Sequence, residues 1–216
     1  MSLIEQPFPA LFPEIFFDAS ACIYPSSKLP LARGKRKFLL PDVSALLDEE
    51  KFADFYMSWD SEGLSLLCQV ERPFIDCVYP SFDEGDSLEL FIDTRDLKEV
   101  GVIHRFCHHF LFLPVEVQGV RSLEVTNFRG EDKHSLADPA QLCVETTFEK
   151  KSYCYAIYLS REVLYGYDPV SIPRLGFSYR LHRAKGRPQH FPLSTKACAI
   201  ERFPALWASL QLKESI

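Results

Sequence analysis

Short extended strands, rather than helices, dominate the pattern of apolar and polar positions along this chain. Between residues 53 and 212 apolar side chains recur with a period of two, and stripes with the 3.6-residue period of an amphipathic helix are missing. The run SLELFID, residues 87–93, is the clearest example. Its leucine and isoleucine side chains share one face of a strand, whereas Glu89, Phe91 and Asp93 share the other. The run therefore predicts a strand with one apolar face and one face that carries two carboxylates.

Similar runs follow one another about every 10–15 residues, with turn-forming residues between them. The run ADFYMSWDSEGLSLLCQV has turn residues at positions 60–63 and predicts a tight hairpin. The other runs, in chain order, are HRFCHHFLFLP, RSLEVTNF, QLCVETTFE, SYCYAIYLS, RLGFSYRLHR and LWASLQLK. About nine strands without a long helix predict an all-β fold, an antiparallel two-sheet β-sandwich. A chain of 216 residues suits a single domain that spans residues 1–216.

The first 41 residues lack this pattern and are predicted to form an irregular, proline-rich N-terminal segment. Pro7, Pro9 and Pro13 prevent a continuous apolar helix there. The basic run RGKRKF, residues 33–38, predicts a solvated loop, with binding of an anionic partner as the alternative. Residues 43–52, VSALLDEEKF, suit a short helix or an edge element. No secretory signal is recognised, because a basic start and a small-residue cleavage site are both missing.

Composition and charge indicate a globular protein. The chain is 47% hydrophobic and 25% charged, and its formal net charge of −6 argues against nucleic acid as a partner. No run reaches the roughly 18 apolar residues of a membrane span. The seven cysteines are odd in number, scattered, and lack a C-x-x-C pair. We therefore expect reduced, unpaired thiols and a cytoplasmic protein.

The stretch GVIHRFCHHFLFLP, residues 101–114, holds three of the six histidines of the chain. If residues 104–113 form a strand, His104 and His108 share one face, and Arg105 and His109 share the other. Along such a strand His104 and His108 stand about 13 Å apart, too far for one metal ion to be bound by this stretch alone. A carboxylate of the preceding strand can meet one of these histidines, either as a structural pair, as part of a ligand-binding surface, or in a metal site such as non-haem iron.

Two acidic stretches flank the run SLELFID. In DTRD, residues 93–96, the aspartates are expected to cap backbone N–H groups, and Arg95 pairs with a carboxylate or offers its guanidinium to an anion or a sugar. The stretch DEGD, residues 83–86, has oxygen ligands for calcium but lacks the spacing of a known calcium loop. Catalytic signatures for nucleophiles, zinc proteases or nucleotide phosphates are missing. The candidate ligand-binding residues are Glu89, Asp93, Arg95, His104, Arg105, His108 and His109.

The order of these pieces resembles a known family. SWDSEGLSLLCQV, GDSLELFIDTRD, HRFCHHFLFLP, LGFSYRL and FPALWASLQL together look like a DOMON-like sandwich, similar to family-9 carbohydrate-binding modules and to uncharacterised bacterial proteins of that fold. The resemblance covers roughly residues 30–212 and implies a domain that binds sugars or haem. Sugar-binding members use aromatic rings and haem-binding members use a methionine. Here Trp59 and Trp207 are expected in the core instead. Met57, in the middle of an apolar strand, is the only internal methionine that haem binding could use.

These observations favour a non-enzymatic module that binds a carbohydrate-like or small polar ligand. One alternative is a metal- or haem-binding protein that uses the histidine-rich residues 104–109. Another is a purely structural module that binds a protein partner. The sequence does not identify a cofactor or a metal.

Overall fold

The computed structural model describes residues 18–26 and 36–214 of the chain. The prolines at positions 7, 9 and 13 and the first three residues of the basic run lie outside the described residues. The described part contains strands and short 3-10 segments but no α-helix, so the all-β prediction is confirmed. The strands are β1 (Ser20–Pro25), β2 (Ala53–Asp60), β3 (Gly63–Val70), β4 (Ser87–Asp93), β5 (Cys107–Val117), β6 (Val120–Glu124), β7 (Cys143–Phe148), β8 (Tyr153–Ser160), β9 (Arg174–His182), β10 (Gln189–Phe191) and β11 (Ala208–Leu212). The 3-10 segments are η2 (Arg36–Phe38), η3 (Phe82–Glu84), η4 (Pro139–Gln141), η5 (Ile200–Arg202) and η6 (Pro204–Leu206).

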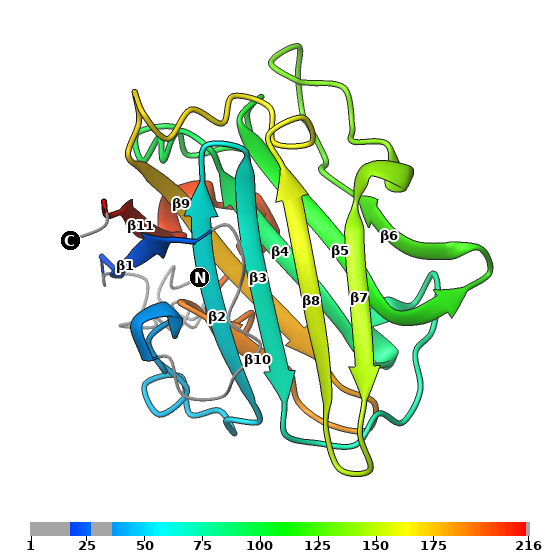
Figure 1. Cartoon of the computed structure of the whole chain (residues 1–216). Coiled ribbons are helices and arrows are strands. Elements are labelled where there is room, and N and C mark those ends of the chain that lie inside the picture. Colours follow the sequence, from blue (N-terminus) through cyan, green and yellow to red (C-terminus); the bar gives the residue numbers. More distant parts are fainter. Residues whose placement is uncertain (1–17, 27–35, 215–216) are drawn as a thin grey trace, which may run out of the picture.

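The strands form one continuous sheet that folds back on itself. Hydrogen-bonded neighbours follow the order β6-β5-β4-β9-β11-β1-β2-β3-β8-β7, and β10 pairs with β9. In Figure 1, β2, β3, β8 and β7 lie in front of β9, β4, β5 and β6. Strand β1 joins these two halves, because it pairs with both β11 and β2. The structure therefore supports an all-β, nearly barrel-shaped sheet, whereas the prediction of two separate sheets is not established.

The predicted neighbours in sequence are neighbours in the sheet. Strands β2 and β3 form the expected hairpin, with Asp60 opposite Gly63. Strand β5 pairs antiparallel with β4, as the short connection between them predicts. On its other edge β4 pairs with β9, a strand that comes more than 80 residues later. Strand β4 therefore lies between β5 and β9 and is buried along its whole length.

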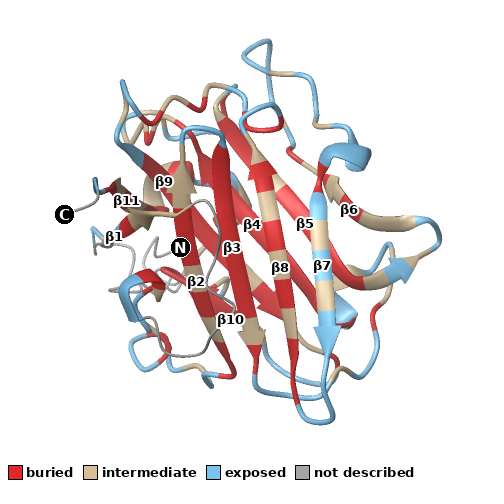
Figure 2. Cartoon of the chain, in the orientation of Figure 1, coloured by how far each residue is buried: buried red, intermediate tan, exposed pale blue. Residues whose placement is uncertain are grey.

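The main core fills the space between the two halves of the sheet. Leu88, Leu90 and Ile92 of β4 belong to it, which confirms the alternation read from the sequence. Across the core the rings of Phe55 and Tyr179 stack with centroids 3.7 Å apart. Figure 2 shows buried residues along most of β3 and β4, whereas the edge strand β7 is largely exposed. Apolar packing between the halves is therefore the main stabilising contribution.

The three residues weighed for sugar or haem binding pack inside the protein. Met57 is fully buried in the main core, and Trp59 packs against that core. Trp207 is 2% exposed and its indole N–H donates to the Ile200 carbonyl at 2.9 Å. The expectation that both tryptophans are core residues is confirmed.

A second, smaller apolar cluster covers the outer face of β4 and β5. It contains Phe91 and Cys107 from the strands, and Leu193, Ile200 and Trp207 from the segment between β10 and β11. This segment explains why the outward side chains of β4 are buried as well as the inward ones. Polar groups on that face must find partners inside the protein.

Several predicted elements are wrong. The first 41 residues are not wholly irregular, because residues 20–25 form β1, and its parallel pairs contradict an entirely antiparallel sheet. Residues 43–52 form a turn at 44–48 with irregular chain on both sides, rather than a helix or a strand. Residues 189–191, which lie between the predicted runs RLGFSYRLHR and LWASLQLK, form an unpredicted strand, β10. Among the described residues no helical segment is long and apolar enough to cross a membrane.

Candidate functional site

A buried glutamate organises the outer face of the sheet. Glu89 lies in the middle of β4, directly opposite Arg180 of β9 and one diagonal step from His109 of β5. Its side chain is fully buried. A carboxylate at this depth requires several donors to replace the water that it loses on folding.

Three side chains supply these donors. The Arg180 guanidinium donates from Nε to Glu89 Oε1 at 2.5 Å and from Nη2 to Oε2 at 2.9 Å. His182 Nε2 lies 2.7 Å from Oε1, and His109 Nε2 lies 2.7 Å from Oε2. Because the carboxylate only accepts, both imidazoles donate to it. We call these four residues the Glu89 network.

The Glu89 network carries charge at neutral pH. Burial alone would raise the pKa of Glu89, but the hydrogen bonds from His109, His182 and Arg180 outweigh burial and hold that pKa well below its usual value. Burial lowers the pKa of Arg180, and Glu89 more than compensates, so that the pKa of the guanidinium is raised. The outcome is a bidentate ion pair with two imidazole donors at its sides.

A cleft of about 400 Å³ opens beside His109. Its walls come from the loop before β5, the loop after β6, and the segment around η5. The polar residues that line it are His109, Asn127, Arg129, Glu201 and Arg202. The apolar residues that line it include Val102, Ile103 and Phe203. Phe203 is 44% exposed and Val102 is 53% exposed, so the cleft has accessible apolar surface beside its charged groups.

One carboxylate oxygen in the cleft wall lacks a hydrogen bond. Glu201 Oε2 is buried and has no hydrogen-bond partner among the described residues. The nearest cation is Arg180 Nη1, 3.7 Å away, which is too long for a hydrogen bond. Glu201 therefore links the Glu89 network to the cleft through this ion pair, and its Oε2 is left without a hydrogen bond.

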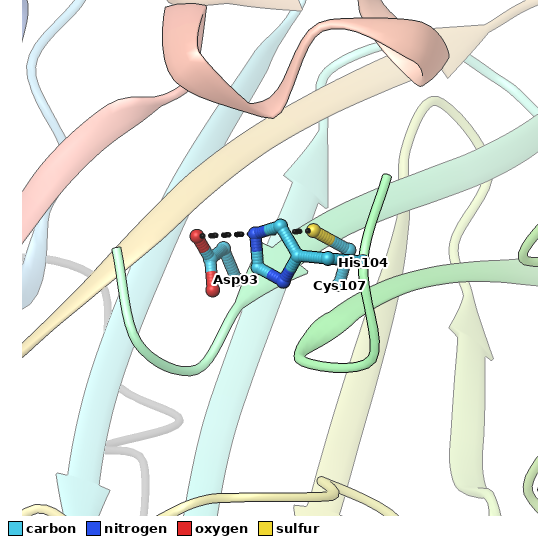
Figure 3. Close-up of side chains that lie close together, drawn as sticks. All are labelled: Asp93, His104 and Cys107. Carbon is cyan, nitrogen blue, oxygen red and sulfur yellow. Dashed lines mark hydrogen bonds and ion pairs between the residues drawn. The ribbon is translucent and has the colours of Figure 1, made fainter. Parts of the chain in front are cut away.

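Asp93, His104 and Cys107 form a second group, shown in Figure 3. His104 Nε2 lies 3.5 Å from Asp93 Oδ2 and 3.3 Å from Cys107 Sγ. Asp93 also accepts the backbone N–H groups of Arg95 at 2.9 Å and of Leu97 at 2.7 Å, as the expected capping role requires. Burial raises the pKa of the Cys107 thiol far above its usual value, so the thiol stays protonated. We call this the Asp93 cluster.

His108 belongs to a third group, on the other face of β5. Glu124 ends β6, and its Oε1 lies 2.9 Å from His108 Nδ1 and 3.0 Å from His134 Nε2. Its Oε2 accepts the backbone N–H of Ala137 at 2.7 Å. Burial would raise the pKa of Glu124, but the close contacts of its carboxylate with the His108 and His134 imidazoles outweigh burial, and the pKa is lowered. We call His108, Glu124 and His134 the Glu124 cluster.

The two remaining candidate arginines take separate positions. The Arg95 guanidinium lies over the Phe106 ring, 5.2 Å from its centroid. Arg105 pairs with Asp132 at the surface. In the acidic stretch 83–86, the buried Asp86 carboxylate accepts the backbone N–H of Ile75 at 2.9 Å, and burial raises the pKa of Asp86.

The structure does not bring the seven candidate ligand-binding residues together. They divide among three buried clusters and two separate arginine contacts, and only His109 lines the cleft. The reason is local: β5 begins at Cys107, so His104 lies in the preceding turn rather than on the strand. The shared face expected for His104 and His108 therefore does not exist. Arg180, His182, Glu124, His134 and Glu201 are site residues that the sequence reading did not select.

Comparisons with known proteins bear on the fold. No protein-family model matches the chain, and no curated protein matches it in sequence. A family-9 carbohydrate-binding module from Caldicellulosiruptor kristjanssonii, in complex with cellotriose, matches with a TM-score of 0.59 at 15% identity over 91% of this chain and 95% of that one. A family-9 module from the same organism, in complex with glucose, matches with a TM-score of 0.58 at 16% identity over 91% of this chain and 97% of that one.

A third solved structure gives the same picture. A candidate carbohydrate-binding protein from Bacteroides uniformis matches with a TM-score of 0.53 at 10% identity over 90% of this chain and 99% of that one. At such identities the likeness establishes the fold and not the ligand. The predicted resemblance to family-9 carbohydrate-binding modules is confirmed at the level of the fold, and the resemblance to DOMON domains stays a prediction.

Proposed function

We propose that this protein is a non-catalytic carbohydrate-binding module, and that a short sugar binds in the cleft beside His109. The fold is that of modules solved with cellotriose and with glucose, which are ligands of those proteins. The observation that carries the proposal for this chain is Oε2 of Glu201, a residue of the cleft wall, which receives no hydrogen bond. An unpaired, buried carboxylate oxygen gains a hydrogen bond when a ligand hydroxyl reaches it.

The rest of the cleft suits a polyhydroxylated ligand. Asn127, Arg129 and Arg202 offer donors, and all three are exposed to solvent. Phe203 and Val102 offer apolar surface for the C–H groups of a sugar ring. Recognition of a sugar requires both kinds of contact, because its rim is polar and its faces are largely apolar.

The Glu89 network positions two residues of the cleft wall. It fixes His109 and, through Arg180, holds the carboxylate of Glu201 in place. A binding site held by buried ion pairs loses little conformational entropy when the ligand arrives. This support is expected of a binding module and requires no catalytic group.

Isothermal titration calorimetry with glucose and cellotriose tests the proposal. The expected result is binding by the unaltered chain, with affinity reduced about two- to tenfold in Phe203→Ala, as loss of a ring contact implies. Glu201→Gln is expected to weaken binding by about ten- to a hundredfold, because it replaces a charged acceptor. Phe148→Ala is the matched control, since Phe148 is 43% exposed but lies on β7 outside the cleft.

The absence of binding to both sugars and to a wider glycan panel would contradict the proposal. Equal weakening by Phe203→Ala and Phe148→Ala would contradict the location of the site. In the first case the exposed apolar residues of the cleft would favour the alternative of a protein partner.

A further inference from the structure

The Glu124 cluster and the Asp93 cluster differ in whether their imidazole N–H groups can satisfy all the neighbouring acceptors. In both groups the ligand-type atoms lie within 4.8 Å of one another, and each offers three of the side chains that bind transition metals. The hydrogen bonds around each imidazole decide where its protons lie. Following these bonds separates the two groups.

In the Asp93 cluster the protons are accounted for. His104 Nδ1 accepts the backbone N–H of Phe106 at 3.3 Å, so the imidazole carries its proton on Nε2. That N–H faces Asp93 Oδ2 at 3.5 Å and Cys107 Sγ at 3.3 Å, and Asp93 is already satisfied by two backbone N–H groups. A neutral histidine thus completes the group, and the lone pair needed for a metal is already in use.

His134 in the Glu124 cluster is in the opposite situation. Its Nδ1 lies 2.6 Å from the Arg105 carbonyl, and its Nε2 lies 3.0 Å from Glu124 Oε1. Both neighbours only accept hydrogen bonds. A neutral imidazole that donates from Nδ1 to the carbonyl must direct the lone pair of Nε2 at a carboxylate oxygen.

His108 shows the same pattern. Its Nδ1 faces Glu124 Oε1 at 2.9 Å and its Nε2 faces the Tyr165 carbonyl at 3.4 Å. Satisfying all four contacts with protons alone would need two imidazolium rings beside one carboxylate. The side chains of His108 and Glu124 are fully buried, and that of His134 is 3% exposed. Two buried cations against one anion are unfavourable in this environment.

The carboxylate oxygen itself is crowded. Glu124 Oε1 meets His108 Nδ1, His134 Nε2 and the Thr126 hydroxyl, which donates at 2.7 Å. Each carboxylate oxygen has about two lone-pair positions, so three partners exceed its capacity. Thr126 is oriented independently, because its hydroxyl oxygen accepts the His109 backbone N–H at 2.8 Å. The two imidazole nitrogens are therefore the contacts that need another partner.

We propose that the Glu124 cluster is a site for one divalent transition-metal ion such as Zn²⁺. His108 Nδ1, His134 Nε2 and Glu124 Oε1 are the protein ligands. Each imidazole is then neutral and donates its other N–H to a backbone carbonyl, which is the usual outer-shell arrangement of a metal-binding histidine. Ligand atoms of a tetrahedral zinc site stand about 3.4 Å apart, so the present 2.9 and 3.0 Å need to open by only a few tenths of an ångström.

The surroundings suit an ion that holds the structure together. Phe110 stacks on His108 with centroids 5.4 Å apart, and Tyr165 stacks on His134 at 5.6 Å. His134 lies in the connection between β6 and β7, so the ion would tie this connection to β5. The same connection supplies Asn127 and Arg129 to the cleft. The site is nevertheless separate from the cleft, because His108 and His109 project to opposite faces of β5.

Metal binding is tested on the full chain after removal of metals by a chelator. Zn²⁺ titration by calorimetry is expected to give one site per chain, and bound Zn²⁺ is expected to raise the melting temperature. His134→Ala is expected to lose the site or to weaken it more than about a hundredfold. His104→Ala is the matched control and is expected to bind one ion with unchanged affinity, because its cluster needs no metal.

Co²⁺ provides a test that needs no variant. Bound at the Glu124 cluster, Co²⁺ is expected to show visible d–d absorption without a thiolate-to-metal charge-transfer band, since none of the three ligands is a cysteine. A charge-transfer band would show that the ion is bound by a cysteine and overturn the proposal. So would the absence of Zn²⁺ and Co²⁺ binding, or loss of binding in His104→Ala with retention in His134→Ala.

Discussion

Replacing Glu89 by glutamine removes one negative charge from a fully buried position. The three side chains that donate to Glu89 then face a neutral amide. Of the two ion pairs that Arg180 makes among the described residues, only the one with Glu201, 3.7 Å from Nη1, then remains. The amide NH₂ also points at either Arg180 or the imidazoles, which are donors themselves. Breaking a buried ion pair on one side costs about 3–5 kcal/mol, and we expect about 3 kcal/mol here because the glutamine carbonyl still accepts.

Urea unfolding at pH 7 measures this loss. With a slope of about 1–3 kcal/mol per molar urea, a change of 3 kcal/mol moves the unfolding midpoint down by at least about 1 M. Glu116→Gln is the matched control, because Glu116 is an exposed residue of β5, and its midpoint is expected to stay unchanged. A midpoint for Glu89→Gln that equals the control would refute the reasoning that the Glu89 network stabilises the sheet.

The stabilisation by Glu89 is also expected to depend on pH. The pKa of Glu89 in the folded protein is below its ordinary value of 4.5, so the unfolded chain binds this proton more readily. The stabilisation by Glu89 is fully present above pH 4.5 and is lost as the pH falls through the folded pKa. The difference in unfolding free energy between the unaltered chain and Glu89→Gln is therefore expected to shrink below about pH 4.5. A difference that grows on acidification would contradict this assignment.

Three further predictions follow from the fold and the clusters. His109→Ala removes a charged hydrogen bond and a ring packed on Phe91 at 4.3 Å, so we expect urea unfolding to show a loss of about 1.5–3 kcal/mol, and an unchanged midpoint would be the contrary result. All seven cysteines have free thiols in the structure, and thiol titration of the chain denatured without reductant should find close to seven groups. Mainly disulfides instead would count against the cytoplasmic location that we propose. Far-ultraviolet circular dichroism should be dominated by strand signals, and a helical spectrum would be inconsistent with the eleven strands of the described residues.

The sequence predicted most of the strands because their signal is local. The alternation in SLELFID and the turn between β2 and β3 depend only on neighbouring residues. The pairing of β4 with β5 was also predictable, since a short connection joins them. Strand β1 was missed because its parallel partners, β11 and β2, are not joined to it by a tight turn. Strand β10 was missed because it has only three residues, although it pairs with β9, the strand before it in the chain.

In the candidate site, only contacts between β4 and its neighbour β5 were predictable from the sequence. Once β5 pairs with β4, contact between Glu89 and His109 follows from register, and it was among the predicted alternatives. Alternation in RLGFSYRLH predicts that Arg180 and His182 share one face of a strand. It does not predict that they meet Glu89, because 91 residues separate Glu89 from Arg180. His104 lies in the turn before β5 and not on the strand, and no residue of the histidine stretch predicts this turn.

The central claim is that the cleft beside His109 binds a sugar, and an NMR titration of the ¹⁵N-labelled chain with cellotriose tests it most directly. We expect saturable shifts of backbone amides around residues 101–103, 127–129 and 199–203, the three segments that contribute to the cleft. The amides of β7, on the opposite edge of the sheet, serve as the internal reference. Saturable shifts confined to other segments, or no shifts at any concentration of cellotriose, would contradict the claim.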